Sequence, residues 1–306
     1  MYLRLLSSAC LALSLIASSV HATPPPAAPG HGIDPSDWNA PQKPFRIFAN
    51  TWYVGPHGLS SILVDTGQGL ALFDGDLPES APLIEAHVRA LGFHVRDIKW
   101  ILNSHAHGDH AGGIAALQAA SGAQVLASKD GARELALGGA DRDDPQYGAI
   151  PDYPPVRQVR VVRDGETVRL GDVAIAAHYT PGHTPGSTSW TWTSCAGRRC
   201  LRMVYADSLT PISAPGFRFS DHPRYVAAFR SAIATVAALP CDVLLTPHPD
   251  ASGFWEKVAR RRSDTDVAPL VDAGACRAYA AAYAKVLDAR LARERAVVGE
   301  KGRDPM

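Results

Sequence analysis

The chain has 306 residues, of which 46% are hydrophobic, and its 30 acidic residues balance its 30 basic ones. This length suits one large domain or two small ones with a substantial core. Because the formal net charge is zero, the composition gives no support to a protein that binds nucleic acid or an anionic membrane surface.

The first 22 residues have the pattern of a secretory signal peptide. Arg4 supplies a positive charge before an apolar run over 5–20, and Val20-His21-Ala22 provides the small residues of a cleavage site. The run is shorter than the roughly 20 residues of a transmembrane helix, which disfavours a membrane anchor. We therefore expect export to the periplasm, with cleavage after Ala22.

A lead-in rich in Pro, Ala and Gly (23–45) precedes the expected folded domain, 46–293, and a frayed tail follows at 294–306. Short apolar runs between glycine turns predict strands, and amphipathic spacing predicts helices. In chain order we expect strands at 46–54, 61–65 and 70–73, a helix at 79–91, a strand at 98–102, a helix at 113–120, strands at 157–163, 166–170, 173–178, 189–193 and 201–205, a helix at 223–238, a strand at 242–246 and a helix near 275–293. Strands followed by helices in both halves favour a layered α/β domain with a pseudo-repeat.

The cysteines fit an oxidising compartment. Cys10 leaves with the signal peptide, and the four that remain are an even number, as expected for disulfides. Cys195 and Cys200 flank a hairpin-like turn, so among three pairings we favour Cys195–Cys200 with Cys241–Cys276. A cysteine zinc site is disfavoured because no pair has the Cys-x-x-Cys spacing.

The segment 103–113 reads Asn-Ser-His-Ala-His-Gly-Asp-His-Ala-Gly-Gly and lies between a predicted strand and a predicted helix. This segment has two possible interpretations: a metal site, or a polar loop that is merely rich in histidine. His105 and His107 alternate as at a strand end, so both can face one ion, whereas the neighbours Asp109 and His110 point apart and can serve a second. The small residues around them leave room for close approach to an ion.

Two such sites need more ligands than this segment supplies. Catalytic zinc takes about three protein ligands and a water, so two ions require about six. His183, in Pro-Gly-His-Thr-Pro-Gly, and His248, in Thr-Pro-His-Pro, each follow a predicted strand in a conformationally restricted loop. The other histidines lack such context, and His57, in a Gly-Pro-His-Gly turn, is the one to re-examine.

This pattern resembles the signature of the metallo-β-lactamase superfamily. More narrowly, four stretches resemble its subclass B3, so the resemblance covers nearly the whole chain after residue 22: 58–63, 74–81, 205–217 and 239–249. The resemblance implies an α/β fold, a four-layer αβ/βα sandwich with the active site at one edge.

The resemblance also implies roles for single residues. One Zn²⁺ ion would be bound by His105, His107 and His183, and a second by Asp109, His110 and His248. Asp109 would also be catalytic, because it can orient the attacking hydroxide. Ser208 and Thr210 would hold the substrate carboxylate, and Gln146, in a long loop at 139–155, would cover the substrate.

The implied activity is zinc-dependent hydrolysis of the β-lactam amide bond of penicillins, cephalosporins and carbapenems by a metal-bound hydroxide, which confers antibiotic resistance. We expect a monomer that acts on this small-molecule substrate, with no nucleic-acid or membrane partner. The sequence after the signal peptide has no Ser-x-x-Lys stretch, so a serine lactamase has no support. Two alternatives stay open: a thioesterase or lactonase of the same fold, in which Asp207 would bridge the metals, and an exported zinc-binding protein.

Overall fold

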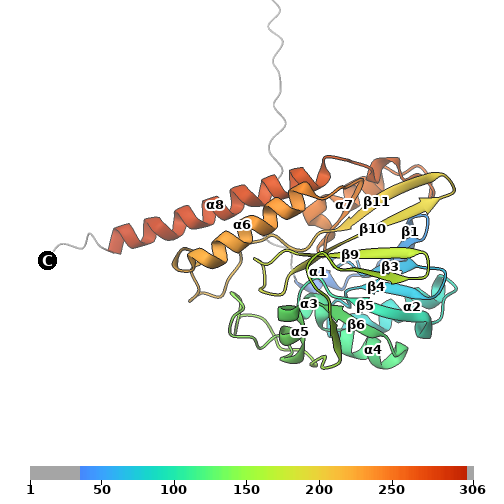
Figure 1. The fold of residues 1–306 in the computed structure, drawn as a ribbon, viewed down its shortest axis with the longest axis horizontal. Helices are drawn as coiled ribbons and strands as arrows, with labels where there is room; N and C mark the ends of the chain where they lie inside the picture. Colours follow the sequence, from blue (N-terminus) through green and yellow to red (C-terminus); the bar gives the residue numbers. More distant parts are fainter. Residues whose placement is uncertain (1–34, 302–306) are drawn as a thin grey trace, which may run out of the picture.

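The computed structural model describes residues 35–301. The predicted signal peptide with its cleavage site after Ala22, most of the predicted lead-in, and residues 302–306 of the predicted tail lie outside the described residues. Within them, two β-sheets pack face to face and helices cover the outer side of each sheet (Figure 1). The predicted four-layer αβ/βα sandwich is confirmed.

The first sheet has seven strands in chain order, β1 to β7. Neighbours pair antiparallel from β1 to β4 and parallel from β4 to β7. Parallel neighbours need a crossover connection, and α2, α4 and α5 lie in these crossovers. The bounds are β1 Phe45–Phe48, β2 Thr51–Tyr53, β3 Ile62–Asp65, β4 Leu70–Phe73, α2 Ala81–Ala90, β5 Ile98–Leu102, α4 Ile114–Ser121, β6 Gln124–Ala127, α5 Lys129–Ala136 and β7 Val159–Val161.

The second sheet has five strands in the order β12-β11-β10-β9-β8. All its pairs are antiparallel except β11 with β12, and α6 makes the crossover between those two. The bounds are β8 Thr167–Leu170, β9 Val173–Tyr179, β10 Thr188–Ala196, β11 Arg199–Tyr205, α6 Pro223–Ala238, β12 Val243–Leu245 and α8 Ala275–Lys301. Shorter helices are α1 Pro35–Trp38, α3 Gly108–Ala111, α7 Phe254–Ala259, η1 Pro78–Ser80, η2 Val95–Asp97, η3 Phe219–Asp221, η4 Pro249–Ser252 and η5 Ala268–Leu270.

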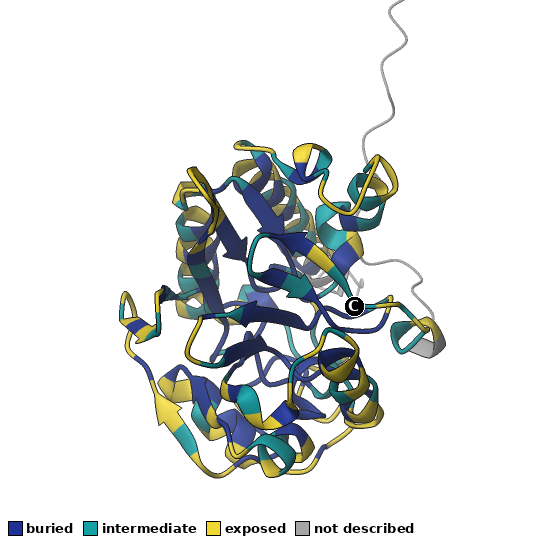
Figure 2. Ribbon diagram, turned by 90° about the vertical axis from the view of Figure 1, so that its right-hand side faces the viewer, coloured by how far each residue is buried: buried dark blue, intermediate teal, exposed yellow. Residues whose placement is uncertain are grey.

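The core lies in three clusters that correspond to the interfaces between the four layers. The middle cluster joins the two sheets and contains Phe73, Trp190 and Tyr205, all fully buried. Strands that are covered on both sides read as apolar runs, and β4, Leu-Ala-Leu-Phe, is buried at every position. In Figure 2 the central strands are dark, whereas the outer helices and the loops carry most of the exposed residues.

The sequence missed or misplaced several elements. The predicted strand 46–54 is two strands, because Ala49 adopts a left-handed backbone conformation (φ 48°) that ends β1 and turns the chain into β2. The elements β6, α5 and α7 were not predicted. At the other end, α8 continues to Lys301 rather than ending at 293, and Glu294, expected in a frayed tail, is buried.

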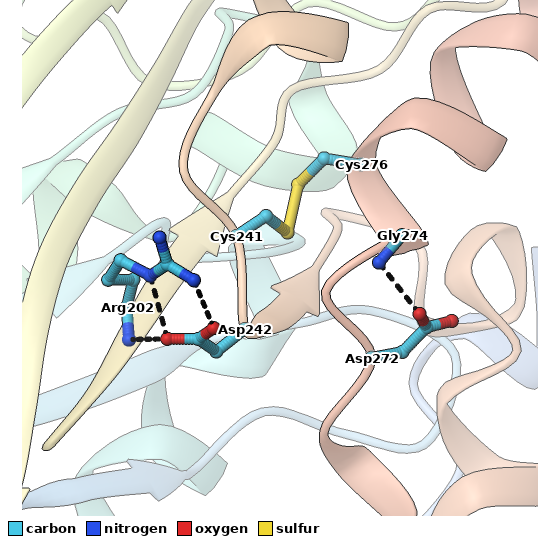
Figure 3. The surroundings of a disulfide bond; sticks show 6 residues. All are labelled: Arg202, Cys241, Asp242, Asp272, Gly274 and Cys276. Carbon is cyan, nitrogen blue, oxygen red and sulfur yellow. Dashed lines mark hydrogen bonds and ion pairs between the residues drawn. A yellow bond between two sulfur atoms is a disulfide. The ribbon is translucent and has the colours of Figure 1, made fainter.

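Both favoured disulfides are present, Cys195–Cys200 across the β10–β11 hairpin and Cys241–Cys276 between the start of β12 and the start of α8. Figure 3 shows the second, with Asp242 accepting hydrogen bonds from Arg202 on the adjacent strand. This disulfide ties the last strand to α8. None of the helices in 35–301 is long and apolar enough to cross a membrane.

Candidate metal centre

The histidine segment begins where β5 ends, and hydrogen bonds to Asp74 fix its conformation. Asp74 Oδ1 accepts from Ser104 N at 2.7 Å and from Asn103 Nδ2 at 3.1 Å, and Oδ2 accepts from Ser104 Oγ at 2.6 Å. Asn103 Nδ2 also donates to the His105 carbonyl at 2.7 Å. Burial raises the pKa of Asp74 to about 7. The polar residues before the first histidine therefore shape the turn.

The glycines of this segment have a structural role that differs from the one the sequence suggested. A Cβ on Gly112 would lie 2.7 Å from the backbone nitrogen of Pro78, and one on Gly113 would lie 2.2 Å from the carbonyl oxygen of Gly75. These glycines let α3 and α4 pack against the backbone after β4. Space for backbone packing accounts for glycine at these two positions.

Three histidines form a first triad. His105 and His107 come from the segment after β5, and His183 from the loop between β9 and β10. Their closest ligand atoms lie within 4.8 Å of one another, and all three residues are buried. Because the two loops belong to different sheets, the triad lies at the edge where the sheets meet.

Carboxylates fix the ring orientation of two of these histidines. His105 Nδ1 lies 2.8 Å from Asp207 Oδ1, and His107 Nε2 lies 2.8 Å from Asp144 Oδ2. A carboxylate accepts the N–H of a neutral imidazole, so each contact leaves the other ring nitrogen as a lone-pair donor. Those donors are Nε2 of His105 and Nδ1 of His107.

A third partner fixes the last ring of the triad. His183 Nδ1 lies 2.9 Å from both the carbonyl oxygen and the hydroxyl of Thr210. The carbonyl can only accept, so Nδ1 carries the hydrogen and Nε2 is the lone-pair donor. All three rings of the first triad thus have a defined tautomer.

A second triad adjoins the first. Asp109 Oδ2 lies 3.2 Å from His110 Nε2 and 3.3 Å from His248 Nε2, and the two Nε2 atoms are 3.2 Å apart. The three atoms converge on one point, and His105 lies within 4.8 Å of the Asp109 and His110 ligand atoms. The Nδ1 atoms of His110 and His248 are buried and have no hydrogen-bond partner among residues 35–301.

The protonation states suit metal binding. Burial lowers the pKa of His105 and His183 well below the ordinary value, so both are neutral at pH 7. Burial alone would raise the pKa of Asp109, but the neighbouring His110 and His248 hold it well below its usual range. His105 Nε2 is buried with no partner in the described part of the chain. Neutral imidazoles, an ionised carboxylate and an orphaned lone pair fit zinc ions.

The three predicted substrate-binding residues lie in two loops beside the triads. Ser208 is buried next to Asp207, and Thr210 touches His183 as described above. Gln146 is buried, and its backbone N–H donates to Asp144 Oδ1 at 2.7 Å. The loop of Gln146 therefore contacts the first triad through Asp144.

No sequence pattern identified Asp144, which lies 37 residues from His107 in an irregular acidic loop. The sequence did single out Asp207, but as a bridging ligand. His57 belongs to neither triad and stacks on Trp255, with ring centroids 4.4 Å apart. Of the other histidines that were set aside, His87 bonds the Val54 carbonyl.

Comparison with known proteins shows which proteins this chain resembles. The family model of the metallo-beta-lactamase superfamily matches residues 46–195. The chain is 52% identical to Rm3 metallo-beta-lactamase, over 85% of this chain and 97% of that one, with a TM-score of 0.82. It is 49% identical to MEM-A1, a subclass B3 metallo-beta-lactamase from a soil metagenome library, over 85% of this chain and 99% of that one, also with a TM-score of 0.82.

A curated sequence relative carries a different name. The chain is 35% identical over 130 residues to a hydroxyacylglutathione hydrolase of Anaeromyxobacter dehalogenans, and the match covers 42% of this chain. It spans only 40% of that relative's length. The solved structures thus resemble this chain over a much larger part of its length.

Proposed function

Because this chain belongs to the metallo-β-lactamase superfamily, and within it to subclass B3, we propose that it hydrolyses the amide bond of β-lactam antibiotics with two zinc ions. The observation that carries the proposal is the pair of adjoining triads, whose six ligand atoms face inward. One ion would be held by His105, His107 and His183, and the other by Asp109, His110 and His248. When bound, zinc supplies Lewis-acid chemistry, lowers the pKa of water towards neutrality and polarises the amide carbonyl.

The protein's own residues position these ligands and the reacting groups. Asp207 and Asp144 hold the imidazoles of His105 and His107, so the lone pairs of Nε2 of His105 and Nδ1 of His107 are available to an ion. The Asp109 carboxylate is ionised at neutral pH and accepts a hydrogen bond from the attacking water, which orients its lone pair towards the carbonyl carbon.

The substrate carboxylate would be bound by the hydroxyls of Ser208 and Thr210. The His183 Nδ1–H donates to Thr210, so the hydroxyl hydrogen of Thr210 stays free to donate to a carboxylate. Gln146, in the loop fixed by Asp144, would cover the bound substrate.

A thioesterase or lactonase is the strongest alternative, since a relative bears the name of a thioester hydrolase. In that reading Asp207 would bridge the two metals. Its Oδ1 instead lies 2.8 Å from Nδ1 of His105, the ring nitrogen opposite the ligand atom Nε2. This contact supports a positioning role for Asp207, which favours the lactamase.

The test is hydrolysis of a carbapenem by the protein after residue 22, before and after treatment with a chelator, and again after zinc is added. A hydroxyacylglutathione thioester serves as the competing substrate. We expect carbapenem turnover that disappears with the chelator and returns with zinc. Turnover of the thioester alone, by folded protein with zinc bound, would transfer the assignment to the alternative.

We also propose the cellular location and the oligomeric state of the protein. Residues 1–22 act as a signal peptide cleaved after Ala22, and the enzyme acts as a monomer in the periplasm, where it confers resistance. The two disulfides support an oxidising compartment. Mass spectrometry of periplasmic protein, which would give a chain starting at Thr23, tests the cleavage site.

A further inference from the structure

The segment 206–222, between β11 and α6, carries Ser208 and Thr210 but contains only one short helix, η3. Irregular segments are mobile unless other parts of the molecule hold them. This segment is held by α8, which lies along α6 and extends beyond the sandwich (Figure 1). Three side chains of α8 contact it: Tyr279, Arg290 and Glu294.

Glu294 makes the densest set of contacts. Its side chain is only 7% exposed. Oε2 accepts from the backbone N–H of Ser220 at 2.7 Å, and Oε1 accepts from that of Phe219 at 3.2 Å. The Glu294 carbonyl accepts from Arg218 Nη2 at 2.6 Å. One residue of α8 thus binds three consecutive residues of the segment.

Arg290, one helical turn earlier, completes this contact. Its Nε donates to Glu294 Oε1 at 2.5 Å, and its Nη2 donates to Ser213 Oγ at 2.8 Å. Its guanidinium lies 5.7 Å from the centroid of the buried Phe219 ring. Ser213 Oγ in turn donates to the Phe217 carbonyl at 3.0 Å. The ion pair therefore fixes the segment at 213 as well as at 218–220.

Two further contacts connect segment 206–222 with residues of the metal centre. Tyr279 donates to the Asp207 carbonyl at 3.1 Å, directly before Ser208. Ala214 N donates to the Pro145 carbonyl at 2.8 Å, in the loop that carries Asp144. The two substrate-binding hydroxyls lie between the Tyr279 contact and the contacts of Arg290 and Glu294.

We propose that Arg290 and Glu294 are positioning residues that hold segment 206–222, and with it the hydroxyls of Ser208 and Thr210, in the geometry that binds the substrate carboxylate. The kinetic consequence rests on the proposed function, because it takes these hydroxyls as the carboxylate site. The mechanical consequence, a rigid segment, does not depend on it.

The test compares Glu294→Gln, Arg290→Met and the double variant with Asp288→Asn. Asp288 of α8 pairs with Arg230 of α6 at 2.6 Å, but both side chains are about half exposed and neither is hydrogen-bonded to the segment. Loss of a buried charge-assisted hydrogen bond should raise KM for a carbapenem about tenfold, with kcat and bound zinc nearly unchanged. Because the two residues act as one unit, the double variant should match the single ones.

Hydrogen exchange of the backbone amides gives the second measurement. The amides of 213–220 should exchange faster in the Glu294 and Arg290 variants, while those of the two sheets and the Asp288→Asn control stay protected. Arg290→Lys keeps the charge and replaces Arg290→Met if that variant does not fold. Its KM should lie between those of the unaltered protein and the Arg290→Met variant.

Unchanged KM and unchanged exchange at 213–220 would overturn the proposal. So would faster exchange throughout the chain, or loss of kcat and zinc together with KM, because the pair would then serve general stability. If the unaltered protein hydrolyses no β-lactam, the proposed function fails, and the exchange measurement still decides whether α8 holds the segment.

Discussion

The two triads use the same kind of ligand but differ in what lies behind the rings. In the first triad, Asp207, Asp144 and Thr210 each contact the far nitrogen of one histidine. In the second, the far nitrogens of His110 and His248 have no partner within the described chain. The second triad instead contains an ionised ligand of its own, Asp109.

This difference shows two ways of preparing a metal site. The first triad depends on partners that fix its tautomers, whereas the second depends on direct charge attraction. Partners of this kind typically change metal affinity by about 10–100-fold. We therefore expect substitutions behind the rings to affect the first ion much more than the second.

The largest effect should come from removing a ligand of either triad. His107→Ala and Asp109→Ala should each lower kcat/KM by a factor on the order of 1,000 while the protein stays folded, because each removes a group that holds the reacting centre. Carbapenem kinetics and a thermal melt measure the two properties. Full activity in either variant would refute the assignment of that triad.

Next in size should be Asp207→Asn and Asp144→Asn. Each should weaken binding of one zinc ion by about 10–100-fold and leave the other ion unaffected, as measured by competition with a chromogenic chelator. Asp141→Asn is the matched control, since Asp141 is buried in the same loop as Asp144 but pairs with Arg133. Equal weakening in the control, or of both ions, would remove the difference between the triads.

A smaller effect should come from the substrate hydroxyls. Ser208→Ala and Thr210→Val should raise KM about tenfold with little change in kcat, since they remove binding that is equal in the ground and transition states. Thr210→Val keeps the backbone carbonyl that contacts His183, so zinc affinity should stay the same. Lost zinc in this variant would show that the hydroxyl itself fixes the ring.

The smallest effect should appear in the pH dependence of stability of the metal-free protein. The folded state keeps His105 and His183 neutral, whereas the unfolded chain protonates them below about pH 6.5. The unfolded state then binds more protons than the folded state. The free energy of unfolding therefore has its full value above about pH 6.5 and decreases as the pH is lowered further. His105→Asn should give a shallower fall in denaturant titrations between pH 7 and pH 5; an unchanged slope would contradict a neutral His105.

What the sequence could predict depended on whether the interacting residues are close along the chain. The ligands from His105 to His110 form a local pattern, and His183 and His248 each follow a strand. Asp144 could not be identified, because an acidic residue in an irregular loop becomes informative only when the fold places it against His107.

The same limit explains the error at the C-terminus. Charged residues after 293 look like a solvent-exposed tail when they are read in isolation. Glu294 is buried because its partners, Phe219 and Ser220, lie more than 70 residues earlier in the chain. Likewise, Gly131 weakens a helical pattern within α5, but the fold packs this part of the helix closely on a distant loop, since a Cβ on Gly186 would lie 2.3 Å from Gly131 N.

The most direct test is a zinc titration of the metal-free protein in which bound zinc and carbapenem hydrolysis are followed together. The two-zinc assignment predicts two ions per chain, bound in two steps, with full turnover when both are present and with one step selectively weakened by Asp207→Asn. A single ion per chain, or two bound ions without β-lactam turnover in folded protein, would contradict it.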